Sequence, residues 1–183
     1  NRLEEILSTK LVFLCLPTLY NEEINEYDKS AIMEICTYLN DMKYKGIVIV
    51  KSTIEPETTY NLSKKFKKLK ICHNPEFLTA RTAVEDFANQ KYMLIGGDDT
   101  QFSVVEFSKQ FPEMLFYKES IRDLILIKYA RNSFLATKVA FFNDLYDVVV
   151  KSKGNWERVR QGIGMDERIG LSHTLVPGPD GKL

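Results

Sequence analysis

The chain has 183 residues, of which 44% are hydrophobic and 27% are charged, a composition typical of one globular domain or one domain with part of a second. Its 25 basic and 25 acidic side chains cancel, so the charge balance favours neither a nucleic acid nor a membrane surface as a partner. No apolar run approaches the roughly 18 residues that a membrane span requires.

The first part of the chain alternates apolar strands with helices. Residues 11–16 form a continuous apolar run, which predicts a strand, and residues 47–50 and 69–72 predict two more. Between the first two, apolar residues at helical spacing follow Asp28 and end at Gly46, and a polar helix is expected at about 57–67. Apolar strands that alternate with helices predict an α/β fold whose parallel sheet is covered on both faces.

Polar residues follow each of these three strands. They are Pro17-Thr18, Ser52-Thr53 and Asn74-Pro75-Glu76. Ligands of open parallel sheets bind beyond the carboxyl ends of the strands, so we expect Thr18, Thr53 and Glu76 at one edge. Hydroxyl groups there can hold a ribose, a phosphate or a water, and the Glu76 carboxylate can transfer a proton. Alternatively, Thr53 could begin the next helix and Glu76 could be a solvated carboxylate in a turn.

The cysteines and histidines suggest no further site. Cys15, Cys36 and Cys72 are an odd number without CxxC spacing, and the chain shows no secretion signal, so we expect a reducing, cytoplasmic environment. Cys72 lies in an apolar strand and is expected to be a packing residue. His73 is expected to line the exit of the same strand, and no metal site is expected.

A long helix is expected in the last third of the chain. Ser120 and Asp123 form a start that resembles a capping box, and the helical pattern continues to about Lys151, with Gly154 as the stop. At 1.5 Å per residue this helix would be about 45 Å long. Its apolar residues form two neighbouring stripes: Leu135, Val139, Phe142, Tyr146 and Val149 in one, and Phe134, Phe141, Leu145 and Val148 in the other. A helix that is apolar around so much of its circumference must be buried between domains or against another subunit, so we expect self-association through residues 134–149.

Lys128 and Asn132 lie one turn apart on one face of this helix. Asn is unfavourable inside a helix, so its position suggests a role. The alternative is that both are solvent-exposed helix residues, which is the more common situation for such side chains.

Four motifs lie in order within about residues 11–178: residues 74–87, residues 89–97, residues 128–143 and residues 162–170. Together they resemble the UDP-glucose/GDP-mannose dehydrogenase family. Residues 74–87 resemble the NPEFL loop of the family, and the match continues through Asn89, Gln90 and residues 92–97. Residues 128–143 resemble the signature of the family's central helix, and residues 162–170 resemble the segment that follows it. The resemblance implies that residues 1–119 are the C-terminal part of a Rossmann-like NAD-binding domain. Residues 120–183 would then be the long central helix and the start of the central, dimerisation domain.

The resemblance also implies an activity. It is the NAD-dependent oxidation of the C6 alcohol of a nucleotide sugar to the acid by two successive hydride transfers, as in the conversion of UDP-glucose to UDP-glucuronate for polysaccharide synthesis. Phe77-Leu78 after Glu76 favours UDP-glucose or GDP-mannose over a UDP-N-acetylhexosamine. UDP-glucose is the first expectation and GDP-mannose the second. The implied assembly is a homodimer through the central helix.

The resemblance also implies roles for individual residues. Lys128 and Asn132 would face the sugar and stabilise charge on its oxygen. Glu76 would act as acid or base, in hydrolysis of a thioester, and Thr53 would hold the water or the nicotinamide beside it. Further cofactor contacts would come from Leu16, Pro17, Thr18 and Ser52, and further substrate contacts from Phe77, Leu78, Thr79 and Arg168. The arginine would reach the substrate phosphates of a neighbouring subunit, whereas Lys138, farther along the helix, would have no role.

The chain also departs from the family pattern. It contains no G-x-G-x-x-G turn, and none of its cysteines stands where the family has its nucleophile, so we interpret it as an internal piece that oxidises no nucleotide sugar by itself. The alternative of a different class is a folding or dimerising module without catalysis. Ala80 stands where many members have a second glutamate, Leu16 where a threonine is frequent, and Ile125 where a glutamate is frequent.

Overall fold

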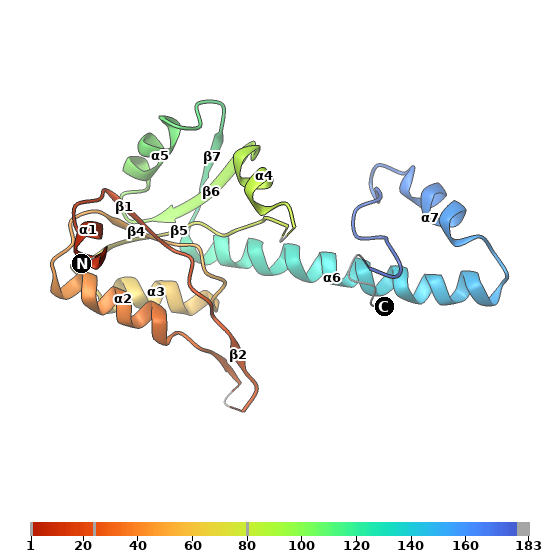
Figure 1. Ribbon diagram of the computed structural model, residues 1–183, viewed down its shortest axis with the longest axis horizontal. Coiled ribbons are helices and arrows are strands. Elements are labelled where there is room, and N and C mark those ends of the chain that lie inside the picture. Colours follow the sequence, from red (N-terminus) through yellow and green to blue (C-terminus); the bar gives the residue numbers. More distant parts are fainter. Residues whose placement is uncertain (1, 24, 80, 179–183) are drawn as a thin grey trace. The chain divides into compact units, whose positions relative to one another are not determined.

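The computed structural model describes residues 2–23, 25–79 and 81–178 (Figure 1). The chain forms two compact units, Asn1–Lys128 and Tyr129–Leu183. Ala80, at which the family pattern is broken, and residues 179–183 lie outside the described residues.

A five-stranded sheet with the strand order β1-β4-β5-β6-β7 organises the first unit. Its strands are β1 (Leu11–Leu14), β4 (Ile47–Val50), β5 (Lys70–His73), β6 (Tyr92–Gly97) and β7 (Leu115–Lys118). β1, β4 and β5 are parallel neighbours, and so are β6 and β7. The predicted α/β fold with a mostly parallel sheet is therefore confirmed.

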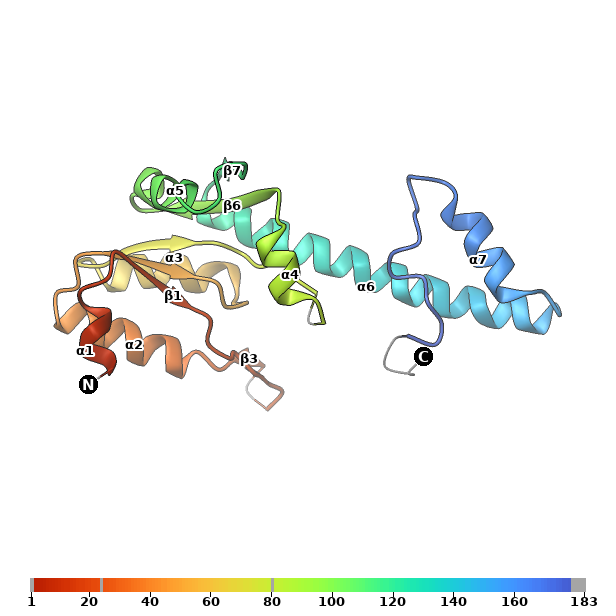
Figure 2. The ribbon, with the colours of Figure 1, turned by 45° about the horizontal axis from the view of Figure 1, so that its top comes forward.

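Helices cover both faces of this sheet (Figure 2). α2 (Ser30–Asp41) and α3 (Pro56–Lys65) lie on one face and α5 (Thr100–Ser108) lies on the other. Along β4, Val48 and Val50 belong to the core on the α2 and α3 side, whereas Ile47 and Ile49 belong to the core that contains Phe107 of α5. Because successive side chains of a strand point to opposite faces, one uninterrupted apolar strand fills two cores.

One pair of strands departs from the expected parallel sheet, because β6 runs antiparallel to β5. Cys72 pairs with Gly97 and His73 with Gly96. A parallel neighbour requires a crossover of a dozen or more residues along the sheet. Among the described residues of the connection, α4 (Ala83–Ala88) is the only helix, and the chain re-enters the sheet at the edge from which it left. Gly97 permits the close pairing, since a Cβ atom there would lie 2.3 Å from the carbonyl oxygen of Ile71.

Two predicted strands have shifted ends. The first ends at Leu14, two residues earlier than predicted, because its partner β4 ends at Val50. The amides of Lys51 and Ser52 then both donate to the carbonyl oxygen of Leu14, at 3.0 and 3.1 Å, and the chain leaves the sheet. The third strand is displaced by one residue, to Lys70–His73.

Two helices end at residues other than the predicted glycines. Gly46 and Gly154 were the predicted stops, but Lys43 and Lys153 adopt the left-handed conformation, with φ of 54° and 57°. Gly46 instead allows the backbone of Lys10 to lie close to it, because a Cβ atom at this position would lie 2.5 Å from the carbonyl oxygen of Lys10. α3 begins three residues after Thr53, so the alternative that Thr53 starts this helix is wrong.

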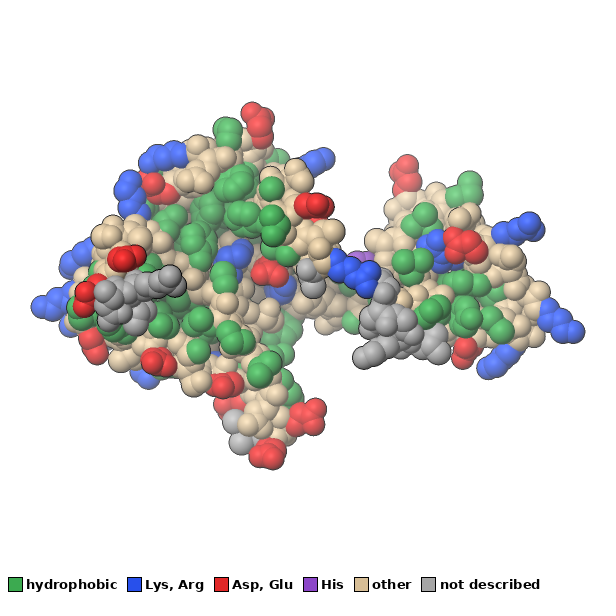
Figure 3. All heavy atoms as spheres, viewed as in Figure 1, with side chains coloured by type: hydrophobic (Ala, Val, Ile, Leu, Met, Phe, Trp, Pro, Cys, Tyr) green, Lys and Arg blue, Asp and Glu red, His purple; other side chains and the backbone are tan. Residues whose placement is uncertain are grey.

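The remaining elements of the first unit are short and were not predicted. They are α1 (Arg2–Ile6) and the antiparallel pair β2 (Tyr20–Asn21) and β3 (Glu26–Tyr27). Figure 3 shows hydrophobic side chains over the strands on the visible face of this unit, with charged side chains mostly around its margin. Phe13 of β1 remains 40% exposed beside Phe107.

Helix α6 (Ile121–Lys151) begins in the first unit and continues into the second. The hydroxyl of Ser120 accepts a hydrogen bond from the amide of Asp123 at 3.1 Å, which confirms the predicted start. Within the second unit, Phe142 and Val149 of the first apolar stripe are buried. Phe142 packs edge-on against Trp156 of α7 (Trp156–Gly164), with ring centroids 6.3 Å apart.

The second stripe of α6 is exposed. Phe134 is 68% exposed, Phe141 58% and Val148 59%. Trp156 of α7 thus covers part of the first stripe, around Phe142 and Tyr146, whereas these three residues of the second stripe remain exposed. No described helix is both long enough and apolar enough to cross a membrane.

Candidate active site

The carboxyl ends of β1, β4 and β5 form one edge, and hydroxyl groups join the loops that leave it. The Thr18 hydroxyl donates to the carbonyl oxygen of Thr53 at 2.6 Å. Ser52 is buried, and its hydroxyl accepts from the amide of Leu16 at 2.9 Å and donates to the carbonyl oxygen of Leu16 at 2.8 Å. These two hydroxyls fix the loops to each other, whereas the side chains of Pro17 and Thr53 stay exposed at the edge.

Glu76 lies in the loop that leaves β5 at the same edge. Asn74 and Pro75 are buried, Glu76, Phe77 and Leu78 are half-buried, and Thr79 is exposed. Proline has a fixed φ and disfavours helix in the residue before it, so Asn74-Pro75 holds the chain extended as it leaves the strand. Glu76 is therefore a half-buried residue of the loop after the strand.

Lys128, in the second turn of α6, approaches this loop. Its Nζ donates a hydrogen bond to the carbonyl oxygen of Glu76. The same Nζ lies 5.5 Å from the centroid of the Phe77 ring, within the range of a cation–π contact. The structure thus brings together three of the predicted site residues from two distant segments.

The sequence reasoning missed a second lysine at this edge. Lys51 directly follows β4, and its Nζ donates to Oδ1 of Asn74 at 2.8 Å. Its Nζ also lies 5.9 Å from the centroid of the Phe87 ring. The sequence did indicate this position, because Lys51 is the first residue after a predicted strand. It directly precedes Ser52 and Thr53, which were predicted as site residues.

Burial and the charges of Lys51 and Lys128 shift the pKa values of groups at this edge. Burial lowers the pKa of Lys51 and the nearby Lys128 ammonium lowers it further, whereas Cys15 and the Glu76 carboxylate raise it. Burial also lowers the pKa of His73 to about 4, and both lysine ammonium groups contribute in the same direction. His73 is therefore neutral at pH 7, and its Nδ1 lies 3.5 Å from the hydroxyl oxygen of Thr59.

The buried cysteines are packing residues, as expected for Cys72. Cys36 and Cys72 are both fully buried, and burial raises the pKa of each thiol to about 11. Because the thiolate is the nucleophilic form, these thiols are unreactive at pH 7. Within the described part of the chain no group of three or more potential metal ligands exists.

Two predicted site residues belong to the second unit. Asn132 is exposed on α6. Arg168 is exposed and pairs with Asp166, with 2.5 Å between Nη2 and Oδ2. Arg168 also lines an apolar cavity of about 520 Å³ together with Phe134 and Phe141. Lys138, which was expected to be without a role, lines the same cavity and donates to the carbonyl oxygen of Ile169 at 2.5 Å.

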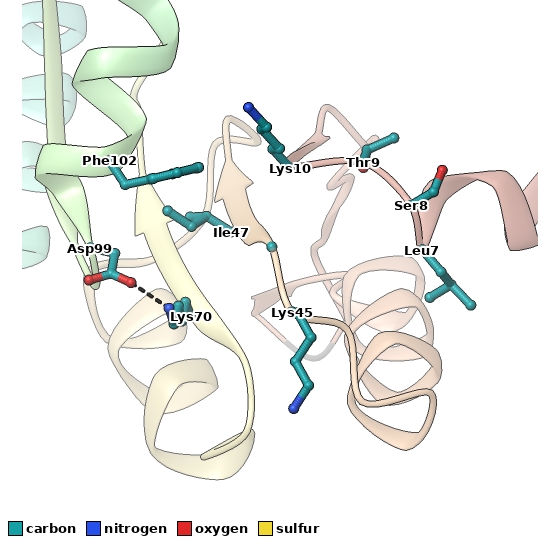
Figure 4. A pocket seen from close by; sticks show the side chains of 10 residues that line it. Leu7, Ser8, Thr9, Lys10, Lys45, Ile47, Lys70, Asp99 and Phe102 are labelled. Carbon is teal, nitrogen blue, oxygen red and sulfur yellow. Dashed lines mark ion pairs between the residues drawn. The ribbon is translucent and has the colours of Figure 1, made fainter.

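A cavity of about 300 Å³ lies at the opposite, amino-terminal edge of the sheet (Figure 4). Lysines 10, 45 and 70 line it, but Figure 4 shows the amino groups of Lys10 and Lys45 pointing in opposite directions. Lys70 pairs with Asp99 at 2.6 Å. Since these charges do not converge on one point, the candidate active site remains at the carboxyl edge.

Comparison with known proteins matches both units to one family. The model of the UDP-glucose/GDP-mannose dehydrogenase family, NAD binding domain, matches residues 2–113, and the model of the family's central domain matches residues 125–181. The first match confirms NAD as the cofactor.

Curated relatives carry the same family name. UDP-glucose 6-dehydrogenase of Rickettsia conorii is 36% identical over 161 residues, which cover 84% of this chain and 36% of that protein. UDP-glucose 6-dehydrogenase of Haloferax volcanii is 30% identical over 187 residues, covering 91% of this chain and 43% of that protein. The chain therefore spans less than half the length of these relatives.

Solved structures share the fold. A UDP-glucose dehydrogenase from Pyrobaculum islandicum superimposes with a TM-score of 0.82 at 25% identity, over 95% of this chain and 43% of that one. A GDP-mannose dehydrogenase from Pseudomonas aeruginosa gives a TM-score of 0.77 at 22% identity, over the same shares of the two chains, and this is a likeness of fold alone. With family models matched across both of its units, the chain belongs to the UDP-glucose/GDP-mannose dehydrogenase family.

Proposed function

We propose that the whole protein that carries this chain oxidises the C6 alcohol of UDP-glucose to the acid, with NAD as the oxidant. The observation that carries the proposal is the convergence of Lys128, Glu76 and Phe77 at the carboxyl edge of the sheet. The relatives at 30% identity or more that are named UDP-glucose 6-dehydrogenases support the choice of substrate.

The reaction sets two demands on the protein. Converting one alcohol to a carboxylate consumes one water and two NAD, and it releases two NADH and three protons. NAD accepts each hydride from C6, so the protein must stabilise the charge on the sugar oxygen and move the protons.

Lys128 meets the first demand. An ammonium group has three N–H donors, and the Glu76 carbonyl fixes the direction of one of them. The Phe77 ring beside it keeps water from one side of the cation. An ammonium that is oriented before the substrate arrives needs little reorganisation as charge develops on the oxygen. Asn132, four residues later, would supply a second donor to the same oxygen.

The carboxylate of Glu76, a half-buried residue, would meet the second demand by taking or giving a proton when water enters the reaction. The exposed hydroxyl of Thr53 would hold that water or the nicotinamide. Leu16 and Pro17 would contact the cofactor. They lie in a loop that hydrogen bonds of Ser52 and Thr18 hold in place, so this part of the edge is ordered before NAD binds. Phe77, Leu78 and Thr79 would contact the sugar.

We also propose that residues 1–119 are the C-terminal part of the NAD-binding domain and that residues 120–183 are the central helix and the start of the central domain. A homodimer would form through α6. The exposed side chains of Phe134, Phe141 and Val148 support this assembly, because apolar stripes of this width are usually covered. Arg168 would then reach the substrate phosphates of the neighbouring subunit.

Steady-state kinetics of the whole protein, followed by NADH absorbance, test the substrate. We expect kcat/KM to be higher for UDP-glucose than for GDP-mannose and UDP-N-acetylmannosamine. A higher value for GDP-mannose would transfer the proposal to that substrate, which Phe77-Leu78 after Glu76 makes the second candidate. The absence of NADH formation with all three substrates would contradict the function.

A further inference from the structure

Lys51 is a half-buried cation at the candidate active site to which the proposed chemistry assigns no role. Burial disfavours its charged form, so keeping a lysine here has a cost that an apolar residue would not have. A solvent-facing lysine would extend into water, but Lys51 turns toward Asn74, and 2.8 Å separate Nζ from Oδ1.

Asn74 is the residue through which Lys51 can act. It is only 3% exposed, and its three hydrogen bonds join three segments. Oδ1 accepts from Lys51, Nδ2 donates to the carbonyl oxygen of Leu94 at 2.7 Å, and the backbone amide donates to the carbonyl oxygen of Val50 at 3.0 Å. The amide side chain is thus held at both ends.

Only Pro75 separates this fixed residue from Glu76. Because the proline ring fixes φ, few free torsions remain between Asn74 and the Glu76 carbonyl that orients Lys128. A shift of the Asn74 backbone, which these hydrogen bonds oppose, would therefore move the acceptor that holds the Lys128 ammonium.

We propose that Lys51 is a positioning residue, which holds Asn74 so that the Glu76 carbonyl orients the Lys128 ammonium. The inference rests on the proposed function in one respect, namely that Lys128 acts on the sugar oxygen. Its geometric part, the dependence of the Lys128 contact on Lys51, stands without that function.

Crystal structures of the whole protein test the geometric part. The variants are Lys51→Met, which keeps the length of the side chain without its donors, and Lys68→Met as an exposed control. We expect the Glu76 carbonyl to leave hydrogen-bonding distance of Lys128 Nζ in Lys51→Met and to keep it in Lys68→Met. If Lys51→Met does not fold, Lys51→Leu replaces it, because leucine also carries no donor for Asn74. Retention of the Glu76–Lys128 contact in the variant that folds overturns the inference.

A double-mutant cycle in kcat tests the functional part. Lys51→Met should lower kcat about tenfold or more, as expected for the loss of a hydrogen bond to a charged group, and should change KM for NAD by less than roughly threefold. In a Lys128→Met background the same substitution should have no further effect on kcat, because the group that it positions is gone. Lys51→Arg, which keeps the cation and its donors, should recover most of the lost kcat.

The outcomes separate the two proposals. An equal loss of kcat in both backgrounds would show that Lys51 acts independently of Lys128 and would overturn the inference. If the unmodified protein oxidises no nucleotide sugar, the proposed function fails, and the crystal structures still decide whether Lys51 positions Lys128.

Discussion

The ammonium of Lys128 is held by the backbone carbonyl of Glu76, 52 residues earlier in the chain. The contact is made to the backbone of Glu76, and it orients the lysine ammonium. This relationship joins the loop after β5 to the start of α6, and the first prediction depends on it.

Replacement of Lys128 by alanine should lower kcat of the whole enzyme about 100-fold to 1,000-fold, the usual cost of losing one donor to a developing oxyanion. The KM for NAD should change little, because the lysine acts on the sugar and not on the cofactor. Steady-state kinetics of folded variants check this, with Lys151→Ala as the control, since Lys151 is an exposed residue of the same helix. Equal kinetics of the two variants would mean that Lys128 takes no part in catalysis.

Lys138 is not a suitable control for that experiment. Its amino group donates to the carbonyl oxygens of Ile169 and Gly170, at 2.5 and 3.4 Å, within the second unit. Lys138→Ala should therefore loosen the segment that carries Arg168, and we expect faster amide exchange at residues 168–170 than in Lys151→Ala. Identical exchange in both variants would show that the Lys138 contacts contribute nothing to this segment.

Two adjacent phenylalanines of α6 provide a matched test of packing. Phe142 is 2% exposed and packs against Trp156, whereas Phe141 is 58% exposed. Phe142→Ala should lower the free energy of unfolding by about 3 to 5 kcal/mol, the usual cost of truncating a buried phenylalanine. Phe141→Ala should change it by less than about 1 kcal/mol. Urea unfolding of both variants checks this, and similar losses would contradict the predicted packing of α7 on α6.

Local features of the chain could be predicted from the sequence, whereas contacts between distant segments could not. The strand at 47–50 and the helix start at Ser120 were predicted correctly, because an apolar run and a capping hydroxyl act over a few residues. The antiparallel direction of β6 depends on Gly96 and Gly97 meeting β5, which no local pattern encodes. The turns at Lys43 and Lys153 were missed because a lysine seldom adopts a positive φ.

In the candidate site, too, local features were predicted and contacts between distant segments were not. The exits of the three parallel strands correctly indicated the edge at which Thr18, Thr53 and Glu76 lie. The hydrogen bond between Lys51 and Asn74 was missed, because the position of a residue at a strand exit does not show which side chain at the neighbouring exit it contacts.

The lowered pKa of His73 should make the stability of the fold depend on pH. Its pKa is about 4 in the folded chain and near 6.5 when exposed, so the unfolded chain takes up a proton first as the pH falls. The stability due to the neutral histidine is complete above pH 6.5 and is lost as the pH falls toward 4, by up to about 3 kcal/mol. Urea unfolding between these pH values should show a larger loss for the unmodified chain than for His73→Gln. An NMR titration in which His73 gains its proton near pH 6.5 would contradict the prediction.

The exposed stripe of α6 predicts self-association. Light scattering at high micromolar concentration should give a mass above that of the monomer for the unmodified chain. Phe141→Asp should shift the equilibrium toward the monomer, because it places a charge among Phe134 and Val148. Glu167→Gln, at an exposed position outside the stripe, serves as the control. A monomer at all concentrations would remove the support for a dimer through this helix.

The proposed reaction is tested most directly by its stoichiometry in the whole protein, with the nucleotide-sugar product identified by mass spectrometry. Oxidation of the C6 alcohol to the acid requires two NADH for each UDP-glucose consumed, with UDP-glucuronate as the product. A single NADH for each sugar with an aldehyde as the final product, or consumption of NAD without oxidation of the sugar, would contradict the proposed function.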